Sequence, residues 1–269
     1  MKIFDCFIYF DEKNLAELRL NILKDYVDFF VICESEETHR GNKKKLNFPL
    51  EKFQDIKEKI IYLKFEKFPK FKSTWDRQNY QRNYLINGLV NANDDDLILF
   101  SDADEIPNPQ ILKDYNNFCQ KKVGIFVQKF FYYKLNLNVP GYSHWEGTRA
   151  CKKKNLKSFT WLRDSTRLKN LNYGFWRIDK YKNISRINEG GWHFSFLGDA
   201  TFISSKIKSY THSEYDEEKF TNLEKINFRI KNMLDPFDRK IDLVKTKIDS
   251  SYPEYIIQNK DKFKELILE

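Results

Sequence analysis

Three acidic residues follow directly on an apolar run near the middle of the chain. Leu97–Phe100 is followed by Ser101 and then by Asp102-Ala103-Asp104-Glu105-Ile106-Pro107. A short buried strand that ends in Asp-x-Asp brings its carboxylates to the carboxyl edge of a sheet, where α/β proteins bind ligands, and an extended pair points both side chains to one face. Mg²⁺ and Mn²⁺ prefer such oxygen ligands. The motif predicts a metal and diphosphate site, with Asp104 on the metal and Asp102 on a bound water or a ribose hydroxyl; the alternative is an ordinary acidic surface.

A second group of candidates lies outside the acidic motif. Arg77, Gln81 and Arg82 fall on one face of a predicted helix that precedes the acids. Arg binds phosphate oxygens through two parallel N–H donors, so this face suits a donor diphosphate, although solvated helix charges are the alternative. Lys206 is a further diphosphate candidate. Glu34 follows an apolar run, where it can accept hydrogen bonds from uracil or ribose or serve as an ordinary loop acid.

A glycine-flanked histidine and three tryptophans complete the candidates. His193 lies within Gly190–Gly198, where small residues permit close backbone approach. It is either the last metal ligand, contributed from a distant segment, or a partly buried histidine bonded among aromatic residues. Trp145, Trp176 and Trp192 can stack on sugar faces or belong to the core of an aromatic-rich protein.

Apolar periodicity predicts an α/β protein in which these residues sit at strand ends and on helices. A strand, a helix capped by Asp11 and a second strand form a β-α-β unit, which favours a parallel sheet. The region from about 134 to 202 is rich in aromatic residues and short turns, so we expect it to be mixed or antiparallel and to form part of the cleft. The predicted strands are 3–10, 29–33, 60–65, 97–100 and 123–133; helices are predicted near 51–59, over 75–90, from Asn108-Pro109, and from about 215.

The length, composition and net charge of the chain limit the class of protein. With 269 residues, 41% of them hydrophobic, the chain is long enough to bury one large α/β domain. Its net charge of +8 comes mainly from dispersed lysines, so a nucleic-acid partner is not expected. Its four cysteines have no metal or disulfide spacing, which favours a reducing, cytoplasmic setting. We expect no transmembrane segment, while peripheral association with the inner face of a membrane and the oligomeric state stay open.

Four ordered segments give the chain a family resemblance. Asp102–Pro107 is similar to the Asp-x-Asp-Glu-Ile-Pro signature of glycosyltransferase family 17, which includes β-1,4-mannosyl-glycoprotein β-1,4-N-acetylglucosaminyltransferases and bacterial and viral relatives. Val31–Ser35, Arg77 with Gln81-Arg82, and Gly191–Ser195 agree with the same family in the same order. The resemblance extends to about residue 235.

The resemblance implies a GT-A type fold, with a Rossmann-like, mostly parallel central sheet and a mixed or antiparallel acceptor side. It also implies an inverting, metal-dependent transfer from a UDP-sugar, with UDP-N-acetylglucosamine as the expected donor and Mn²⁺ or Mg²⁺ held by Asp102, Asp104 and His193. Residues 1–107 would form the nucleotide-sugar-binding half, 108–235 the acceptor-side half and 236–269 a C-terminal helical extension. Because the sequence shows no counterpart of the membrane anchor and stem of the animal enzymes, we expect a bacterial or viral member with a different glycan acceptor.

Inversion at the anomeric carbon requires a carboxylate that deprotonates the acceptor hydroxyl. We select Glu189, beside the Gly-Gly turn, and keep Glu105, the third acid of the motif, as a second catalytic candidate; the other candidates are Glu146, Asp199 and Glu214. Two other classes of protein stay open. A metal-dependent phosphoesterase would need a second metal site, for which the chain offers few histidines, and a non-catalytic carbohydrate-binding protein would stack sugars on its tryptophans.

Overall fold

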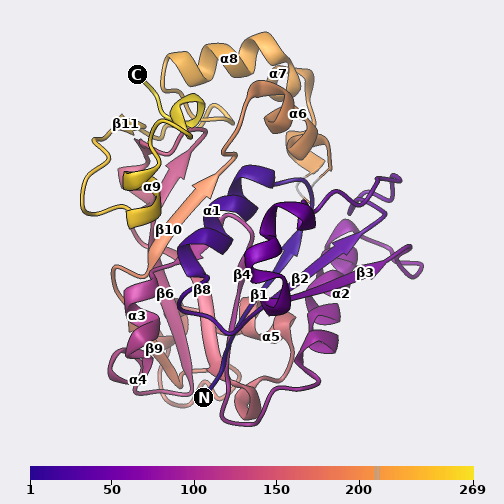
Figure 1. The fold of residues 1–269 in the computed structure, drawn as a ribbon, viewed down its shortest axis with the longest axis vertical. Helices are drawn as coiled ribbons and strands as arrows, with labels where there is room; N and C mark the ends of the chain where they lie inside the picture. The colour runs from indigo at the N-terminus through magenta and orange to yellow at the C-terminus, as the bar shows by residue number, and fades with distance from the viewer. Residues whose placement is uncertain (210, 212) are drawn as a thin grey trace.

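One large sheet covered by helices organises the molecule (Figure 1). The computed structural model of the chain describes residues 1–209, 211 and 213–269. Within these residues, eleven strands share the sheet, whose main path runs β11-β7-β6-β8-β4-β1-β2-β3, while β9 and β10 pair with β6 and β5 pairs with β10. The α/β class predicted from the sequence is confirmed.

The N-terminal half of the sheet is parallel. β1 pairs in parallel with both β2 and β4, and β2 pairs in parallel with β3. In β4, Leu97 and Leu99 pack into the core on the α1 face, whereas Ile98 and Phe100 pack into the core on the opposite face. Because both faces are covered, the strand reads as a continuous apolar run. The elements of this half are β1 (Ile3–Tyr9), α1 (Lys13–Leu23), β2 (Phe29–Ser35), η1 (Leu50–Lys59), β3 (Ile60–Phe65), α2 (Thr74–Tyr84), η2 (Leu85–Leu89) and β4 (Leu97–Asp102).

The following segment adds the mixed half of the sheet. β8 runs antiparallel to both β4 and β6, while β9 and β10 are parallel neighbours of β6. The mixed region predicted for residues 134–202 is therefore confirmed. Its elements, with those that lead into it, are β5 (Glu105–Pro107), α3 (Pro109–Lys113), α4 (Tyr115–Phe118), β6 (Val123–Tyr132), β7 (Leu137–Asn138), η3 (Pro140–Tyr142), β8 (Trp145–Lys152), η4 (Lys153–Asn155), α5 (Phe159–Asp164), η5 (Leu168–Asn172), β9 (Ile184–Ile187) and β10 (Gly191–Ser195).

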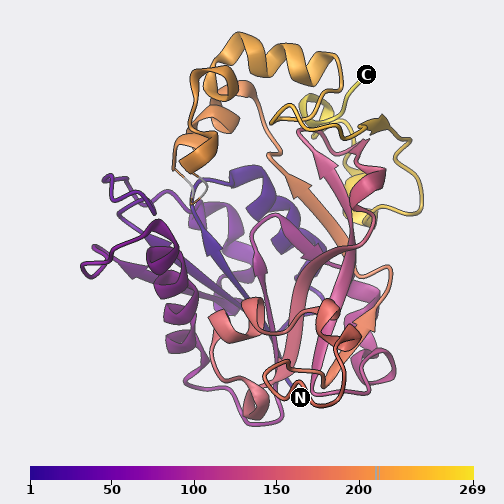
Figure 2. The ribbon, with the colours of Figure 1, turned by 180° about the vertical axis from the view of Figure 1, so that it is seen from behind.

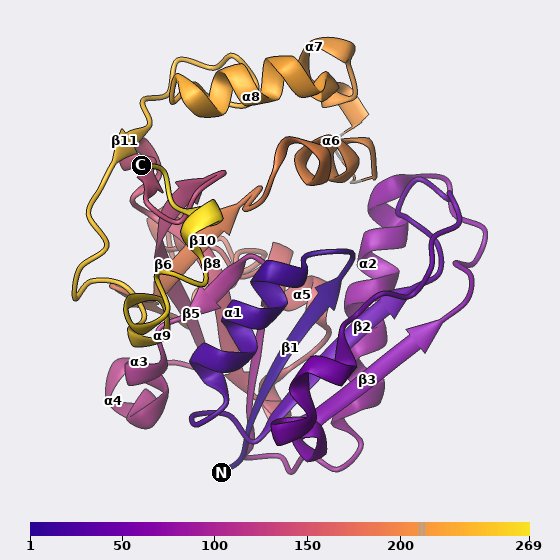
Figure 3. The same ribbon diagram turned by 45° about the horizontal axis from the view of Figure 1, so that its top comes forward.

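The C-terminal segment begins with helices at one end of the sheet. In Figure 3 the arrowhead of β1 points towards α6, and α7 and α8 lie beyond it. Residues 236–269 contain little helix, so the predicted helical extension is wrong. Instead, Tyr252, Ile256, Phe263 and Leu266 of this segment pack into the core on the α1 face. The elements are α6 (Ala200–Ser209), η6 (Ser213–Tyr215), α7 (Glu218–Thr221), α8 (Leu223–Lys231), β11 (Val244–Lys245), α9 (Glu254–Gln258) and η7 (Lys264–Leu266).

The N-terminal cap of α1 differs from the sequence prediction. Glu12, and not Asp11, occupies the N-cap position. The Asp11 carboxylate accepts a hydrogen bond from Asn47 Nδ2 at 2.5 Å, while the Glu12 carboxylate accepts the backbone N–H groups of Phe10 and Asp11. The strand-to-helix connection is thus held by Glu12, whose other oxygen faces the cavity described below.

Helix α2 begins and ends at other residues than predicted. Ser73 and Asp76 form a reciprocal capping box, which starts the helix at Thr74. The helix ends at Tyr84 and continues as the 3₁₀ segment η2, although the sequence pattern predicted one helix to Val90.

The expectations for the cysteines and for a transmembrane segment can be compared with the described residues. All four cysteines are buried free thiols. No helix in the described part of the chain combines the length and the apolar character that a membrane span requires.

Candidate active site

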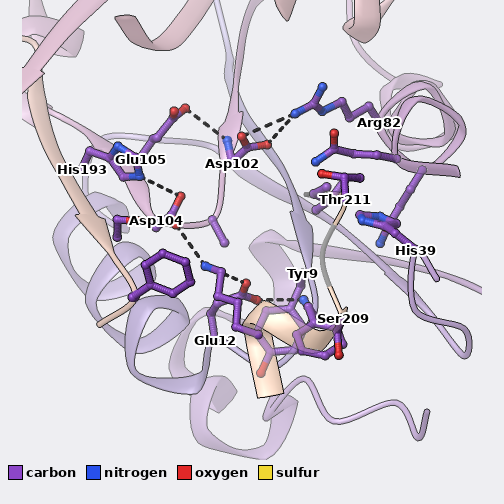
Figure 4. Close-up of a pocket in the computed structure, with 18 of the residues that line it drawn as sticks. Tyr9, Glu12, His39, Arg82, Asp102, Asp104, Glu105, His193, Ser209 and Thr211 are labelled. Atoms are coloured by element: carbon purple, nitrogen blue, oxygen red, sulfur yellow. Dashed lines mark hydrogen bonds and ion pairs between the residues drawn. The ribbon is translucent and has the colours of Figure 1, made fainter. Parts of the chain in front are cut away.

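A cavity of about 540 Å³ opens at the carboxyl ends of β1, β2 and β4. Its lining includes Tyr9, Ser35 and Asp102 at these strand ends and further side chains from α2, α5 and α6. Figure 4 shows acidic and basic side chains that converge on it from different elements. This is the edge of the sheet at which α/β proteins bind their ligands.

The acidic motif forms a turn between two strands. β4 ends at Asp102, and β5 begins after two turn residues, so Asp104 is not part of the same extended strand. The prediction that the two carboxylates share one strand face is therefore wrong, although both line the cavity. Phe194 of β10 donates its N–H to the Asp104 carbonyl at 2.8 Å. Gly191 permits this close packing because a Cβ there would lie 2.1 Å from the Ile106 carbonyl oxygen.

Asp104 lies between an imidazole and an ammonium group (Figure 4). Its Oδ1 is 3.4 Å from His193 Nε2, and its Oδ2 accepts a hydrogen bond from Lys206 Nζ at 3.0 Å. The same Lys206 nitrogen is 3.3 Å from Glu12 Oε1. Burial by itself raises the pKa of Asp104, but Lys206 and His193 outweigh burial and hold that pKa well below its usual range. Asp104 is thus a carboxylate at neutral pH.

Asp102 and Glu105 are held by arginines. Arg82 and Arg163 donate to the Asp102 carboxylate at 3.2 and 3.0 Å. Burial raises the pKa of Asp102, but Arg163 and Arg82 outweigh it and lower the pKa to about 2. Arg163 also binds both oxygens of Glu105 at 2.7 Å, and Trp145 Nε1 donates to Glu105 at 2.8 Å. The fully buried Glu105 carboxylate is therefore engaged in orienting Arg163 and Trp145.

A buried arginine supports the acidic turn from beneath. Arg19 of α1 is fully buried and forms two hydrogen bonds, of 2.6 and 2.7 Å, to the Asp5 carboxylate. It also donates to the carbonyls of Asp102 and Glu105 at 3.1 and 2.9 Å and to Ser101 Oγ at 2.7 Å. Sequence reasoning missed this residue; its only signal is a pair of charges, Asp5 and Arg19, each within an apolar pattern.

His193 packs among aromatic rings of the cavity wall. Its ring centroid is 4.3 Å from that of Phe130 and 4.7 Å from that of Trp145. Its Nδ1 is buried and has no hydrogen-bond partner among the residues that the structure describes. The ring presents Nε2 to Asp104.

The three tryptophans singled out in the sequence occupy different environments. Trp145 lines the cavity. Trp192 is buried, and its Nε1 donates to the Ser251 carbonyl at 3.0 Å on the wall of a second cavity. Trp176 is 69% exposed and lines neither of these cavities. Of these three tryptophans, Trp145 is thus the one in a position to contact a ligand at the acidic turn.

The predicted donor-side residues differ in whether they reach the cavity. Arg82 and Lys206 line it. Gln81 also lines it, but its amide accepts from His39 Nε2 at 2.7 Å and donates to the Cys33 carbonyl at 2.9 Å. Arg77 donates to the His39 carbonyl at 3.1 Å and is not part of the lining. Gln81 and Arg77 therefore hold the loop after β2.

Glu34 is turned away from the cavity. It is fully buried, and its carboxylate accepts the backbone N–H groups of Asn47 and Phe48 at 2.9 and 3.1 Å. Tyr62 donates its hydroxyl to the same carboxylate, and Lys44 forms an ion pair with it. Glu34 therefore closes the loop over residues 36–48, which agrees with the alternative of a loop acid.

Four of the predicted catalytic bases do not line the cavity, and these are Glu146, Glu189, Asp199 and Glu214. Glu189 is exposed, has a positive φ of 51° and borders the second cavity. Asp199 accepts the Phe202 N–H at 2.8 Å at the start of α6. Glu146 accepts the Leu168 N–H at 3.1 Å. The structure therefore does not bring Glu189, the selected base, to the acidic turn.

Asp164, which sequence reasoning did not single out, is the least engaged carboxylate of the cavity lining. Its side chain is 43% exposed, and its carboxylate lies 4.0 Å from Arg82 and 3.8 Å from Arg167. Among the described residues no hydrogen bond to this carboxylate occurs. It is the last residue of α5, which has no recognisable motif, so its place at the cavity depends on the tertiary packing of α5 against α2.

The acidic turn does not by itself form a complete metal-ligand cluster. Across residues 1–209, 211 and 213–269, no group of three or more His, Cys, Asp and Glu side chains is arranged to hold a metal ion. Asp104 and His193 are neighbours, whereas the arginines engage Asp102. Of the three predicted metal ligands, two are thus adjacent.

Comparison with known proteins agrees with the ordered motifs. The sequence model of glycosyltransferase family 17 matches residues 1–268. The chain is 24% identical over 287 residues to the β-1,4-mannosyl-glycoprotein 4-β-N-acetylglucosaminyltransferase of Mus musculus, a match that covers 95% of this chain and 52% of the mouse protein. It is 34% identical over 106 residues to the Homo sapiens enzyme of the same name, over 36% of this chain and 20% of the human protein. The chain thus spans at most about half the length of these relatives.

Solved structures give more distant similarities. Staphylococcus aureus TarS (residues 1–349) matches with a TM-score of 0.40 and 13% identity over 88% of this chain and 70% of that chain. HddC from Yersinia pseudotuberculosis matches with a TM-score of 0.40 and 9% identity over 70% of this chain and 90% of that chain. The family match is the firmer result, because it extends over nearly all residues. The chain belongs to glycosyltransferase family 17.

Proposed function

We propose that the protein is a metal-dependent inverting glycosyltransferase, which moves a sugar from a UDP-sugar to a glycan hydroxyl. The supporting observation is the juxtaposition of Asp104 and His193, 3.4 Å apart, in a cavity that Arg82, Arg163 and Lys206 also line. The named relatives are N-acetylglucosaminyltransferases, so N-acetylglucosamine is the sugar we propose.

Cationic side chains suit the donor diphosphate. Arg82, Arg163, Arg167, Lys206 and Arg239 all line the cavity. Guanidinium groups bind phosphate oxygens through paired N–H donors. A nucleoside diphosphate would therefore offset the repulsion among these cations.

Asp104 and His193 fit a divalent cation as two neighbouring ligands. Their facing atoms are 3.4 Å apart, close to the roughly 3 Å between adjacent ligands of an octahedral ion with bonds of about 2.1 Å. Mg²⁺ and Mn²⁺ usually complete their coordination with waters and substrate phosphates, so two protein ligands suffice. Asp102, held by two arginines, would bond a metal-bound water or a ribose hydroxyl. The metal would stabilise the charge on the departing UDP.

Asp164 is the carboxylate that we assign as the general base, in place of Glu189 and Glu105. It lines the cavity and accepts no hydrogen bond from the described residues, whereas Arg163 and Trp145 occupy Glu105. In the single displacement, the acceptor oxygen forms its bond to the anomeric carbon as the bond to the diphosphate breaks. Asp164 takes the acceptor proton, and UDP leaves.

Release of UDP from UDP-N-acetylglucosamine, with and without Mn²⁺, tests the proposal. Asp104→Asn should lower Mn²⁺-dependent UDP release by about a thousandfold, as expected when a group that stabilises the leaving charge is lost. Asp164→Asn should keep UDP binding, measured by calorimetry, and lose transfer. Asp95→Asn is the matched control, since Asp95 is an exposed acid paired with Lys152 and Lys154.

Three results would contradict the proposal. If neither EDTA nor Asp104→Asn changes the turnover, the proposed metal site is wrong. Release of inorganic phosphate from phosphoesters, without sugar transfer, would indicate a phosphoesterase. Binding of glycans without any response to UDP or Mn²⁺ would indicate a carbohydrate-binding protein.

A further inference from the structure

The turn at residues 173–180 carries large apolar side chains into solvent. Phe175, Trp176 and Ile178 are 89%, 69% and 95% exposed, and Ile178 and Phe175 are the two most exposed large hydrophobic side chains of the described residues. Single exposed apolar residues are common, but a contiguous group usually marks a surface that contacts another apolar phase. The segment follows α5 and belongs to the salmon-coloured turns at the lower end of Figure 2.

This turn is held in one conformation by its own contacts. The Arg177 N–H donates to the Gly174 carbonyl at 3.1 Å, and Lys182 Nζ donates to the same carbonyl. The Arg177 guanidinium binds both oxygens of Asp179 at 2.7 Å. The Trp176 ring lies over Gly174, where a Cβ would come within 2.4 Å of it. The apolar exposure is therefore a property of an ordered turn.

Basic residues flank the apolar tip in the sequence. Between residues 165 and 188 the only acid is Asp179, whereas the bases are Arg167, Lys169, Arg177, Lys180, Lys182 and Arg186. Asp179 is shared by Arg177 and Lys180. The segment therefore combines exposed aromatic side chains with an excess of positive charge, a combination typical of proteins that lie on anionic lipid surfaces.

We propose that this turn docks the protein on an anionic membrane surface. Phe175, Trp176 and Ile178 would enter the boundary between headgroups and acyl chains, where aromatic rings are favoured, and Lys169 and Lys180 would face lipid phosphates. Charge complementarity and the exposed tip favour a lipid surface, because a protein groove would have to match three protruding side chains and also neutralise the surrounding cations.

The docking turn is connected to the acceptor side of the cavity. Trp161 of α5 packs against Tyr181 with centroids 5.1 Å apart. Asn170 donates to the carbonyls of Ser165 and Tyr181 at 2.8 and 3.2 Å. A membrane held by the turn would thus be mechanically linked to α5, which ends at Asp164. The docking itself does not depend on the proposed transfer reaction.

Vesicle sedimentation with the full chain tests the proposal. The protein should bind vesicles of phosphatidylcholine with about 30% phosphatidylglycerol, bind pure phosphatidylcholine vesicles weakly, and lose binding as salt rises. The variant Phe175→Ser/Trp176→Ser/Ile178→Ser should bind anionic vesicles about tenfold more weakly. The matched control is Val90→Ser/Phe228→Ser, which removes exposed apolar side chains elsewhere and should bind as the parent chain does.

Two further variants separate the contributions and guard against misfolding. Lys169→Gln/Lys180→Gln should weaken the binding of anionic vesicles at low salt. The part of the binding that comes from Phe175, Trp176 and Ile178 should remain. Trp176→Phe should keep binding while it removes the blue shift of tryptophan fluorescence that vesicles induce in the parent chain. All variants are compared by their thermal midpoints, and UDP release in solution should be unchanged in each of them.

Several outcomes would overturn the proposal. These are no binding of the parent chain to anionic vesicles, equal binding by the triple variant and the parent, or equal loss in the Val90/Phe228 control. Binding of single-stranded RNA that depends on the same three residues, without vesicle binding, would assign the surface to nucleic acid instead.

Discussion

Asp102 and Asp104 are two residues apart, yet they belong to different charge networks. Asp102 faces the guanidinium groups of Arg82 and Arg163, from α2 and α5. Asp104 faces His193 of β10 and Lys206 of α6. One acid is thus held by cations that bind carboxylates bidentately and never deprotonate, and the other by an imidazole and a single ammonium group.

The difference indicates separate tasks for the two acids. A carboxylate between two arginines has little to gain from a metal, whereas one beside a histidine nitrogen has a second ligand in place. The Asp102 partners lie on α2 and α5 and the Asp104 partners on β10 and α6, so the turn is the point at which these four elements meet at the cavity. Arg19 supports the turn that carries both acids, since it binds the carbonyls of Asp102 and Glu105 on either side of Asp104.

Removal of Arg19 should have the largest effect, because it disturbs both networks together. Arg19→Met leaves the Asp5 carboxylate buried without a partner, which costs about 3–5 kcal/mol of unfolding free energy. Urea unfolding at neutral pH measures this loss. The double variant Asp5→Leu/Arg19→Met removes both charges and should recover most of the stability.

The double variant also separates stability from positioning. Its acidic turn still lacks the donors to the two carbonyls, so UDP release should stay about tenfold below that of the parent chain. An Arg19→Met variant as stable as the parent, or a double variant with full activity, would show that Arg19 does not position the turn.

Replacement of Asp102 should have a smaller effect, of a different kind from replacement of Asp104. Asp102→Asn keeps a hydrogen-bonding side chain beside Arg82 and Arg163, so Mn²⁺ should still stimulate UDP release. We expect KM for the donor to rise about tenfold while the Mn²⁺ concentration for half-maximal rate changes little. Equal loss of Mn²⁺ dependence in Asp102→Asn and Asp104→Asn would contradict the separation of the two networks.

The parallel half of the fold could be predicted from local sequence, whereas the turn between Asp102 and Glu105 was not predicted. The strand at 60–65 and the N-cap at Asn108 occur as predicted, because each depends on neighbouring residues. Glu34 shows the limit of this reasoning. It follows a strand at the correct edge, but the loop after it folds back and takes up its carboxylate.

The residues that complete the site could not be predicted, because long-range packing places them. Arg163 and Asp164 come from α5. Glu12, at the start of α1, contacts Lys206 of α6. No spacing in the sequence relates these segments to the acidic turn. Arg19 could not be predicted for a related reason. Its partner Asp5 lies in a different segment, and the sequence pattern of each segment is mainly apolar.

Acidification should produce the smallest effect, and it should act on the Asp102 side. His39 donates from Nε2 to Gln81, the neighbour of Arg82. Burial lowers the pKa of His39 to about 4, although the hydrogen bond that its ring donates to Gln81 acts in the opposite direction. The unfolded chain, with a histidine pKa near 6.5, therefore binds more protons between these values, so stability falls as the pH drops from about 6.5 to 4. Because His39 as a whole residue is only partly buried, we expect a loss of at most about 2 kcal/mol.

Urea unfolding between pH 7 and pH 4.5 measures this loss, and His39→Gln should flatten the dependence. His144→Gln is the matched control, since His144 is an exposed histidine that does not line the cavity. The carboxylates of the two acids do not titrate in this window, because the pKa of Asp102 is about 2 and that of Asp104 is lower than the usual range. A slope that persists in His39→Gln would place the titrating group elsewhere. If His39→Gln removes the pH dependence of the unfolding free energy, protonation of His39 is the cause of the loss. Acid would then act through the loop after β2, which contacts the Asp102 side of the turn, at a pH where Asp102 and Asp104 are both still charged.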